Sequence, residues 1–229
     1  FSQSSGRNAS LNNLCINAAV DVIILGFVRS FTDTGGYPTI DFAHQPANAS
    51  AAPGLAVCKE FGQRVKQCQQ QGKNIFVSIS DSASNTTFAV GKKGRKEAQG
   101  AAGMMWNLFG EGKGSLLLRP FGPNVVVDGF NLDHEQGSFD NHDVFISRLR
   151  SYRNTASKPI FISAAPVCTL TNRITPEAVI VLVDFIFIRF YNSAACALGT
   201  PSFPPSLEYW YQTVVPSPYA PFPKYSLEA

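Results

Sequence analysis

Short apolar runs separated by longer amphipathic segments dominate the chain. The run Val20–Phe27 (VDVIILGF) is short, rich in β-branched residues and closed by a Gly-Phe step, which predicts a strand buried on both faces. Four further runs share this character and a weaker sixth lies near the end of the sequence: Asn74–Ser80, Val125–Leu132, Ile160–Ala164, Phe185–Phe190 and Lys224–Leu227. The pattern therefore predicts six strands.

Helical spacing occupies the segments between these runs. Residues 56–71 carry apolar side chains three and four positions apart and end before a glycine, which predicts an amphipathic helix. Further helices are expected over residues 95–109 and 141–154 and around Ser206–Val214. Thr175-Pro176-Glu177 combines a capping hydroxyl, a proline and an acid, a sequence typical of a helix start.

Alternation of strands and helices requires a parallel sheet with helical crossovers, either doubly wound or closed into a barrel. The phosphate-binding fingerprints of nucleotide-binding folds, GxGxxG and GxxxxGK[ST], are absent, and we interpret Gly91–Lys96 (GKKGRK) as a basic surface loop. The sequence therefore favours an α/β fold of the (β/α)8 TIM barrel type. No shift in composition before Thr200 marks a boundary, so a single domain over residues 1–229 is expected.

Composition and charge exclude several functional classes. With 45% hydrophobic and 15% charged residues, the chain is too apolar for intrinsic disorder. The net charge is only +3 and the basic residues form no continuous stripe, so nucleic acid is not an expected partner. The most apolar stretch, Ala178–Tyr191, contains Asp184 and Arg189 and is too short to span a bilayer, so no membrane association is expected.

The cysteines and glycosylation sequons point to a secreted protein. Five cysteines, at positions 15, 58, 68, 168 and 196, form no CxxC motif and no metal-ligand spacing, which leaves disulfides or buried thiols. Sequons for N-glycosylation begin at Asn8, Asn48 and Asn85 and lie in polar sequence. We therefore expect an extracellular protein with disulfides and one cysteine left over.

The segment Asp128-Gly-Phe-Asn-Leu-Asp-His-Glu135 carries the candidate chemistry. In an extended strand Asn131, Asp133 and Glu135 share one face, which would point toward the barrel axis. Catalytic groups of such barrels lie at the carboxyl ends of the strands. Neighbouring carboxylates also favour retention of one proton, as a general acid requires. The alternative is a solvated strand end without a catalytic role.

This segment resembles the DGxDxDxE signature of glycoside hydrolase family 18, and its surroundings resemble the class III chitinases of plants and fungi. Arg119-Pro-Phe-Gly precedes it, Ser163-Ala-Ala-Pro166 ends the next strand, and Phe190-Tyr-Asn192 ends the one after, in the order and spacing of that family. The resemblance covers nearly the whole chain. It implies two disulfides, Cys15 with Cys68 and Cys168 with Cys196, and leaves Cys58 without its usual partner.

The resemblance implies retaining, endo-acting hydrolysis of chitin or chito-oligosaccharides without metal or cofactor. By family role Glu135 protonates the leaving oxygen, Asp133 orients the acetamido group of the substrate, and Tyr191 donates a hydrogen bond to its carbonyl oxygen. Phe27 matches an aromatic residue that touches sugar, preceded by a peptide bond that is often cis. The alternatives are that Phe27 is a core residue and that Tyr191 only packs.

Three departures from the family pattern put the activity in doubt. Asn131 stands where most active members have aspartate, and Ser78-Ile-Ser-Asp81 replaces a glycine-containing SxGG. Arg189 replaces a residue that is commonly glutamine, which places a guanidinium beside Tyr191, within reach of Asp133 or Asp81. The resemblance assigns substrate contacts to a group of side chains that includes these departures: Phe27, Asn131, Asp81, Arg189 and Asn192.

The resemblance supports one favoured hypothesis about function and leaves two alternatives. A secreted, monomeric endo-chitinase is favoured because Asp133, Glu135 and Tyr191 are all present. A catalytically inactive relative is the first alternative: a lectin, storage protein or xylanase inhibitor. An endo-β-N-acetylglucosaminidase acting on N-glycans is the second. The first and eighth barrel strands of the family have no counterpart in the sequence, so six strands cannot close the barrel, and we expect the natural chain to be longer.

Overall fold

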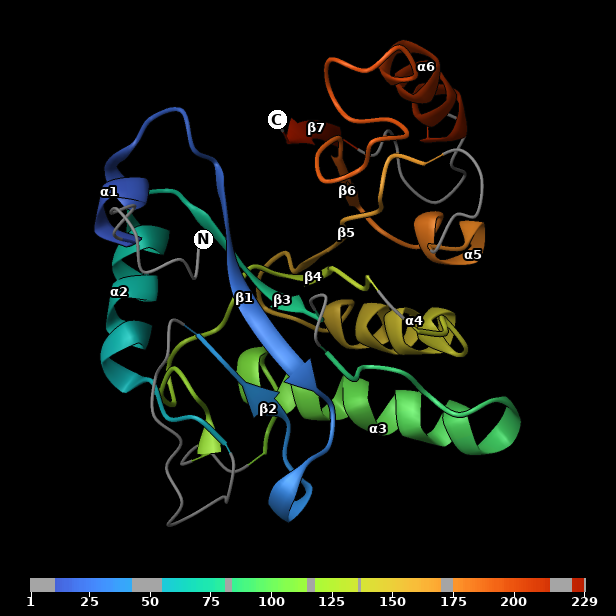
Figure 1. The fold of residues 1–229 in the computed structure, drawn as a ribbon. Helices are drawn as coiled ribbons and strands as arrows, with labels where there is room; N and C mark the ends of the chain where they lie inside the picture. Colours follow the sequence, from blue (N-terminus) through green and yellow to red (C-terminus); the bar gives the residue numbers. More distant parts are fainter. Residues whose placement is uncertain are drawn as a thin grey trace.

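The computed structural model describes residues 11–42, 55–80, 84–114, 118–135, 137–169, 175–214 and 224–228. Its strands form one sheet in the order β2-β1-β3-β4-β5-β6-β7 (Figure 1). The strands are β1 (Val22–Ser30), β2 (Thr39–Ile40), β3 (Asn74–Ile79), β4 (Gly129–Leu132), β5 (Phe161–Ala164), β6 (Phe185–Arg189) and β7 (Lys224–Glu228). The helices are α1 (Leu11–Ile16), α2 (Lys59–Gln70), α3 (Gly91–Phe109), α4 (His142–Arg153), α5 (Glu177–Ile180) and α6 (Phe203–Val214), with a 3-10 turn at Thr34–Gly36.

All six predicted strands are present, and the α/β class is confirmed. From β1 through β3 to β7 every neighbouring pair is parallel and the order follows the chain, whereas β2 pairs antiparallel with the end of β1. A doubly wound sheet would reverse its strand order at one point. Sequential order with helices in succession around the outside (Figure 1) is the arrangement of a barrel wall. Within the described residues the sheet is open, as the expectation of six strands required.

Two of the element boundaries that differ from the sequence prediction have a clear structural reason. Gly91–Lys96 is the first part of α3 rather than a surface loop. Gly94 explains this placement, because a Cβ there would lie 1.5 Å from the carbonyl oxygen of Ala89, so the helix start packs closely on the preceding segment. Lys93 extends into solvent and pairs with Glu97 one turn later at 3.8 Å.

Strand β4 begins at Gly129, four residues later than predicted. The backbone of Gly129 lies between Phe76 of β3 and Phe161 of β5, and a Cβ would approach the Phe76 ring to 2.6 Å. Residues 125–128 come before β4 in the chain and are not part of the strand. In this segment the backbone N–H of Val127 donates to the carbonyl of Phe109, the last residue of α3. The apolar run therefore includes both the approach to the sheet and the strand itself.

The inner face of the sheet is layered from apolar to polar along the strand direction. At the amino-terminal end Phe76, Phe161 and Phe185 form an aromatic cluster with ring centroids 5.2 to 6.4 Å apart. The next register row joins Ser78, Asn131 and Ser163 across three strands. Period-two alternation therefore sends the aromatic, hydroxyl and carboxamide side chains inward, as expected for the interior of a barrel.

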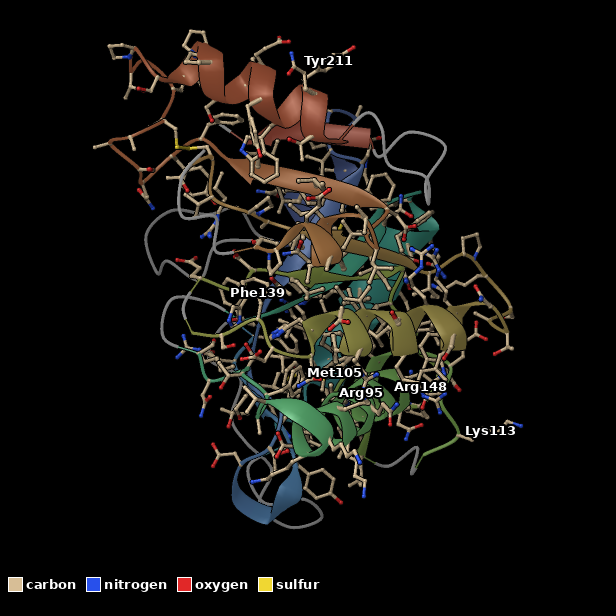
Figure 2. The ribbon with its side chains drawn as sticks, turned by 90° about the vertical axis from the view of Figure 1, so that its right-hand side faces the viewer. Arg95, Met105, Lys113, Phe139, Arg148 and Tyr211 are labelled. Carbon is tan, nitrogen blue, oxygen red and sulfur yellow. A yellow bond between two sulfur atoms is a disulfide. The ribbon has the colours of Figure 1, made fainter. Side chains whose placement is uncertain are left out.

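The helices cover the outer face and enclose the main apolar core. The stripe predicted for residues 56–71 is confirmed in α2, where Phe61, Val65 and Cys68 are buried. Met105 of α3 lies beneath α4, while Lys113 projects from the molecule (Figure 2). Burial of apolar surface of this kind stabilises a domain by roughly 25 cal/mol per Å².

Both disulfides implied by the family resemblance are present, Cys15–Cys68 between α1 and α2 and Cys168–Cys196 between the segments that follow β5 and β6. Cys58 is a buried free thiol, and burial raises its pKa to about 11. A thiol with a raised pKa is mostly protonated and unreactive at neutral pH. Among the described residues, no helix has the length and apolar character needed to cross a membrane.

Candidate active site

The carboxyl end of β4 opens into a cavity of about 130 Å³. Asn131 is the last inward-facing residue of the strand, and Asp133 follows two positions later on the same side. The wall is completed by residues from β1, β3 and the segments after β5 and β6. The lining residues are Ile24, Gly26, Phe27, Ser78, Asn131, Asp133, Ala165 and Tyr191. The cavity therefore collects side chains from five neighbouring strands or strand ends, as expected for a barrel site.

Asn131 is held at both ends of its amide group by neighbouring strands. Its Nδ2 donates to Ser78 Oγ at 2.9 Å, and its Oδ1 accepts from Ser163 Oγ at 2.8 Å. The residue is 2% exposed. A buried carboxamide requires such partners, because an unsatisfied buried polar group is costly. The two serines thus keep a neutral amide at the position where the family pattern has a carboxylate.

Arg189, the last residue of β6, joins the two acidic residues of the site. Its Nη1 contacts Glu135 Oε1 and lies 3.5 Å from Asp133 Oδ1. The Arg189 side chain is 7% exposed, compared with 31% for Glu135. Pairing with Asp133 was an expectation from the sequence, and the structure confirms it. The contact of Arg189 with Glu135 was not expected. The two carboxylates were predicted to interact with each other, but in the structure the guanidinium of Arg189 lies between them and contacts both.

Tyr191 and Phe27 both line the cavity with Asp133. Tyr191 follows β6 and is 38% exposed, and its role as a hydrogen-bond donor to substrate stays a prediction. Phe27 is half-buried, and its backbone exchanges two hydrogen bonds with Asp41. The Gly26–Phe27 peptide is cis, as the resemblance implied. Both aromatic side chains therefore face the same cavity, and their contact with a sugar stays a prediction.

The two remaining predicted substrate contacts are Asn192 and Asp81. Asn192 is exposed, adopts a left-handed backbone conformation with φ of 55°, and is not among the residues that line the cavity. Its substrate contact therefore stays a prediction. Asp81 lies outside the described residues.

Two buried histidines, His134 and His142, pack together beside the segment that follows β4. His134 turns away from Glu135, as predicted, and its ring centroid lies 4.5 Å from that of Phe139 and 4.7 Å from that of His142. His134 Nδ1 is hydrogen-bonded to Thr86 Oγ1 at 3.1 Å. Burial lowers the pKa of His134, and burial together with the neighbouring His134 lowers the pKa of His142 to about 4. Both rings are therefore neutral at physiological pH and support the loop by packing.

Sequence reasoning missed the residues that support the site rather than line it. Ser163 and Thr86 lie on other elements, and nothing local in the sequence shows that they meet Asn131 and His134. The register row from Ser78 to Ser163 is one signal that could have found Ser163, because Ser78, Asn131 and Ser163 are polar residues at equivalent inward positions in three predicted strands. Within the described residues no cluster of three or more His, Cys, Asp or Glu side chains is arranged to hold a metal ion.

One predicted glycosylation sequon lies within the described residues. Asn85 is exposed and lies in the segment after β3, beside the end of β1, where its backbone N–H donates to the carbonyl of Arg29 at 2.9 Å. Its side-chain oxygen accepts a hydrogen bond from Thr87, the third residue of the sequon, at 3.1 Å. Asn8 and Asn48 lie outside the described residues. Occupancy of all three sequons stays a prediction.

Comparison with known proteins finds relatives among fungal chitinases. No family model matches the chain. Chitinase 1 of Candida albicans is 34% identical over 197 residues, which cover 86% of this chain and 40% of that protein. A class III chitinase of Arthroderma benhamiae is 36% identical over 191 residues, covering 80% of this chain and 56% of that protein. The chain therefore spans about half the length of these curated relatives.

Comparison with solved structures finds both an enzyme and an inhibitor. A chitinase from Ipomoea carnea superimposes with a TM-score of 0.75 and 25% identity, covering 90% of this chain and 72% of the other. A xylanase and α-amylase inhibitor protein from Scadoxus multiflorus also has a TM-score of 0.75, with 23% identity and coverage of 98% and 76%. The second likeness concerns the fold alone, since one fold supports several functions.

Proposed function

Because the chain is a relative of the class III chitinases of glycoside hydrolase family 18, we propose that it hydrolyses chitin or chito-oligosaccharides. The proposal includes cleavage within the polymer and retention of configuration at the anomeric carbon. One observation carries it. Asp133, Tyr191 and Phe27 line a single cavity at the carboxyl end of β4, with Glu135 two residues beyond Asp133.

The proposed mechanism uses the substrate's own acetamido group as nucleophile. Glu135 transfers its proton to the glycosidic oxygen as the bond from that oxygen to the anomeric carbon breaks. The acetamido carbonyl oxygen bonds to the same carbon and gives an oxazolinium ion, which water then opens after losing a proton to Glu135. This route needs no carboxylate nucleophile and is an exception to the usual pair of carboxylates.

Two further side chains are assigned to the acetamido group. Asp133 accepts a hydrogen bond from its N–H and holds the carbonyl oxygen in line, and Tyr191 donates its phenolic proton to that oxygen. Both side chains line the cavity, which supports these roles. Positioning and electrostatic stabilisation supply most of the rate enhancement in such a site.

Substrate contacts are assigned to Phe27 and Asn131, which also line the cavity, and, on the family resemblance alone, to Asn192 and Asp81. Arg189 meets the two carboxylates of the site rather than the cavity itself. We further propose that residues 1–229 form one catalytic domain and that the protein is secreted and acts as a monomer. Two disulfides support an oxidising compartment, because such bonds persist outside the cytosol.

Hydrolysis of chitohexaose by the purified protein tests the proposal. Wild type, Glu135→Gln and Glu60→Gln are compared, with Glu60 exposed in the first turn of α2 as the matched control. We expect internal cleavage, β-anomeric products by proton NMR, and a loss of about 10³-fold in Glu135→Gln only. Equal activity in wild type and Glu135→Gln would contradict the assignment of the acid.

A catalytically inactive carbohydrate-binding or inhibitor protein is the second candidate. The contact of Arg189 with both Asp133 and Glu135 favours it, because it occupies the residues that the mechanism needs. Asn131 also favours an inactive protein, because it is neutral at a position where most active members of the family have aspartate. Saturable binding of chitohexaose by wild type with no product after prolonged incubation would support this candidate over the enzyme.

A further inference from the structure

Arg189 is bound in the site through one nitrogen of its guanidinium group. Nη1 contacts Glu135 and is 3.5 Å from Asp133. Nε and Nη2 are buried and have no hydrogen-bond partner among the described residues. Within the described part of the chain, the charge of this nearly buried side chain is therefore compensated by the two carboxylates alone.

Glu135 contacts Arg189 and is not among the residues that line the cavity, although Asp133 is. A carboxylate that accepts from a guanidinium is ionised and has no proton to donate. A general acid must carry a proton and come within hydrogen-bond reach of the leaving oxygen. The observed arrangement is therefore that of a closed site, which has to rearrange before it can react.

Resting on the proposed function, we propose that Arg189 is a positioning residue that latches the site by holding Glu135 away from bound sugar until the ion pair breaks. This Arg189–Glu135 latch is a property of this chain's own residues. It makes substrate binding bear the cost of separating the pair, so it lowers affinity for chito-oligosaccharides. The latch also explains how the site can contain Asp133, Glu135 and Tyr191 and yet hold Glu135 away from the cavity when no sugar is bound.

Asn131 adds no charge to this ion pair. The amide there is neutral, and both its ends are bonded to Ser78 and Ser163. Within the described residues, the carboxylates that Arg189 meets are therefore Asp133 and Glu135.

Opening the latch has a clear physical cost. When Glu135 turns toward the cavity, a guanidinium that is 7% exposed keeps only Asp133 as counter-ion. Removing one partner from a buried ion pair is strongly unfavourable, because the remaining charge is not solvated. Neutralising either member beforehand removes this cost, and neutralising both gains nothing more. The effects of the two substitutions on sugar affinity should therefore not add, and a double-mutant cycle measures this.

The experiment is a double-mutant cycle in sugar binding. Wild type, Arg189→Gln, Glu135→Gln and the double variant are titrated with N,N′-diacetylchitobiose at pH 7 and followed by NMR. We expect each single variant to bind about tenfold tighter than wild type and the double variant to bind no tighter than either. Arg189→Lys keeps the charge, and its affinity should stay within about threefold of wild type.

Controls separate the latch from structural effects and from failure of the proposed function. Arg153→Gln breaks an ion pair with Asp184 at the opposite end of the sheet and should leave binding unchanged. If Arg189→Gln does not fold, Glu135→Gln against wild type still measures the latch. Additive effects, or variants that bind no tighter than wild type, would overturn the latch. Absence of binding in every variant would overturn the proposed function instead.

Discussion

The two ends of the sheet use the same residue types in different ways. At the amino-terminal end Asp184 contacts Arg153, lies 3.4 Å from Arg150, and accepts the amide of Ile162 at 2.9 Å. At the carboxyl end Asp133 and Glu135 share one nitrogen of Arg189. Each end thus has acidic side chains on buried or half-buried arginines, and at the amino-terminal end the carboxylate of Asp184 also receives the backbone N–H of Ile162 near the start of β5.

A second carboxylate at the amino-terminal end repeats this arrangement. Asp128 precedes β4, pairs with Lys158 at 2.5 Å, and accepts the amide of Ile75 at 2.8 Å and the side chain of Gln69 at 2.7 Å. Its donors come from β3, α2 and the segment before β5, so it connects separate parts of the fold. Saturated ion pairs thus anchor the amino-terminal end of the sheet, while the incompletely bonded Arg189 leaves the carboxyl end able to rearrange.

The largest effect is expected when an anchor at the amino-terminal end is removed. Asp184→Ala takes away the acceptor of two arginines and one backbone amide, so the unfolding free energy should fall by about 3 kcal/mol. Urea unfolding followed by circular dichroism measures this change. Asp21→Ala, at an exposed position, is the control. The rate of hydrolysis per folded Asp184→Ala molecule should equal that of wild type. A loss of activity without a loss of stability would show that the amino-terminal end does more than stabilise the fold.

Acid should weaken the carboxyl end through its buried histidines. The pKa of His142 is lowered to about 4 and that of His134 is also lowered, so the unfolded chain binds more protons between pH 6.5 and 4. Stability is then full above pH 6.5 and falls with decreasing pH, by about 2 kcal/mol at pH 5 for His142.

Unfolding free energies at pH 7 and pH 5 for wild type, His142→Gln and Asp184→Ala check this prediction. His142→Gln should lose most of the pH dependence, whereas Asp184→Ala should keep the wild-type slope. A wild-type slope in His142→Gln would show that the acid sensitivity resides elsewhere.

The smallest effect is expected in the middle layer of the sheet. Ser163→Ala removes one neutral hydrogen bond to Asn131, so stability should fall by about 1 kcal/mol. Hydrolysis should decrease a few-fold, because Asn131 is then held only by Ser78. Thermal unfolding and initial rates measure both, with Ser157→Ala at an exposed hydrogen bond as the control. Unchanged hydrolysis together with the stability loss would make this layer purely structural.

Local patterns predicted the elements best where one period dominates. The stripe of α2 and the apolar runs of β3, β5 and β6 each belong to one element, so spacing alone identified them. The start of α3 was missed because its polar, glycine-containing first turn has no apolar stripe. The two-residue strand β2 was missed because it exists only by pairing with the end of β1.

Short-range periodicity in the sequence was sufficient to predict the α/β alternation and the common side of Asn131 and Asp133, which both line the cavity. Glu135 lies beyond the end of β4 and does not line that cavity. Its resemblance to a known family also implied both disulfides and the cis peptide before Phe27. Only the tertiary structure decided which partners these side chains meet. Arg189 reaches Glu135, and Ser78 and Ser163 hold Asn131, because parallel strands far apart in sequence end side by side. Contacts of that kind depend on strand register and on which charges remain uncompensated in a buried site, and no local pattern records either.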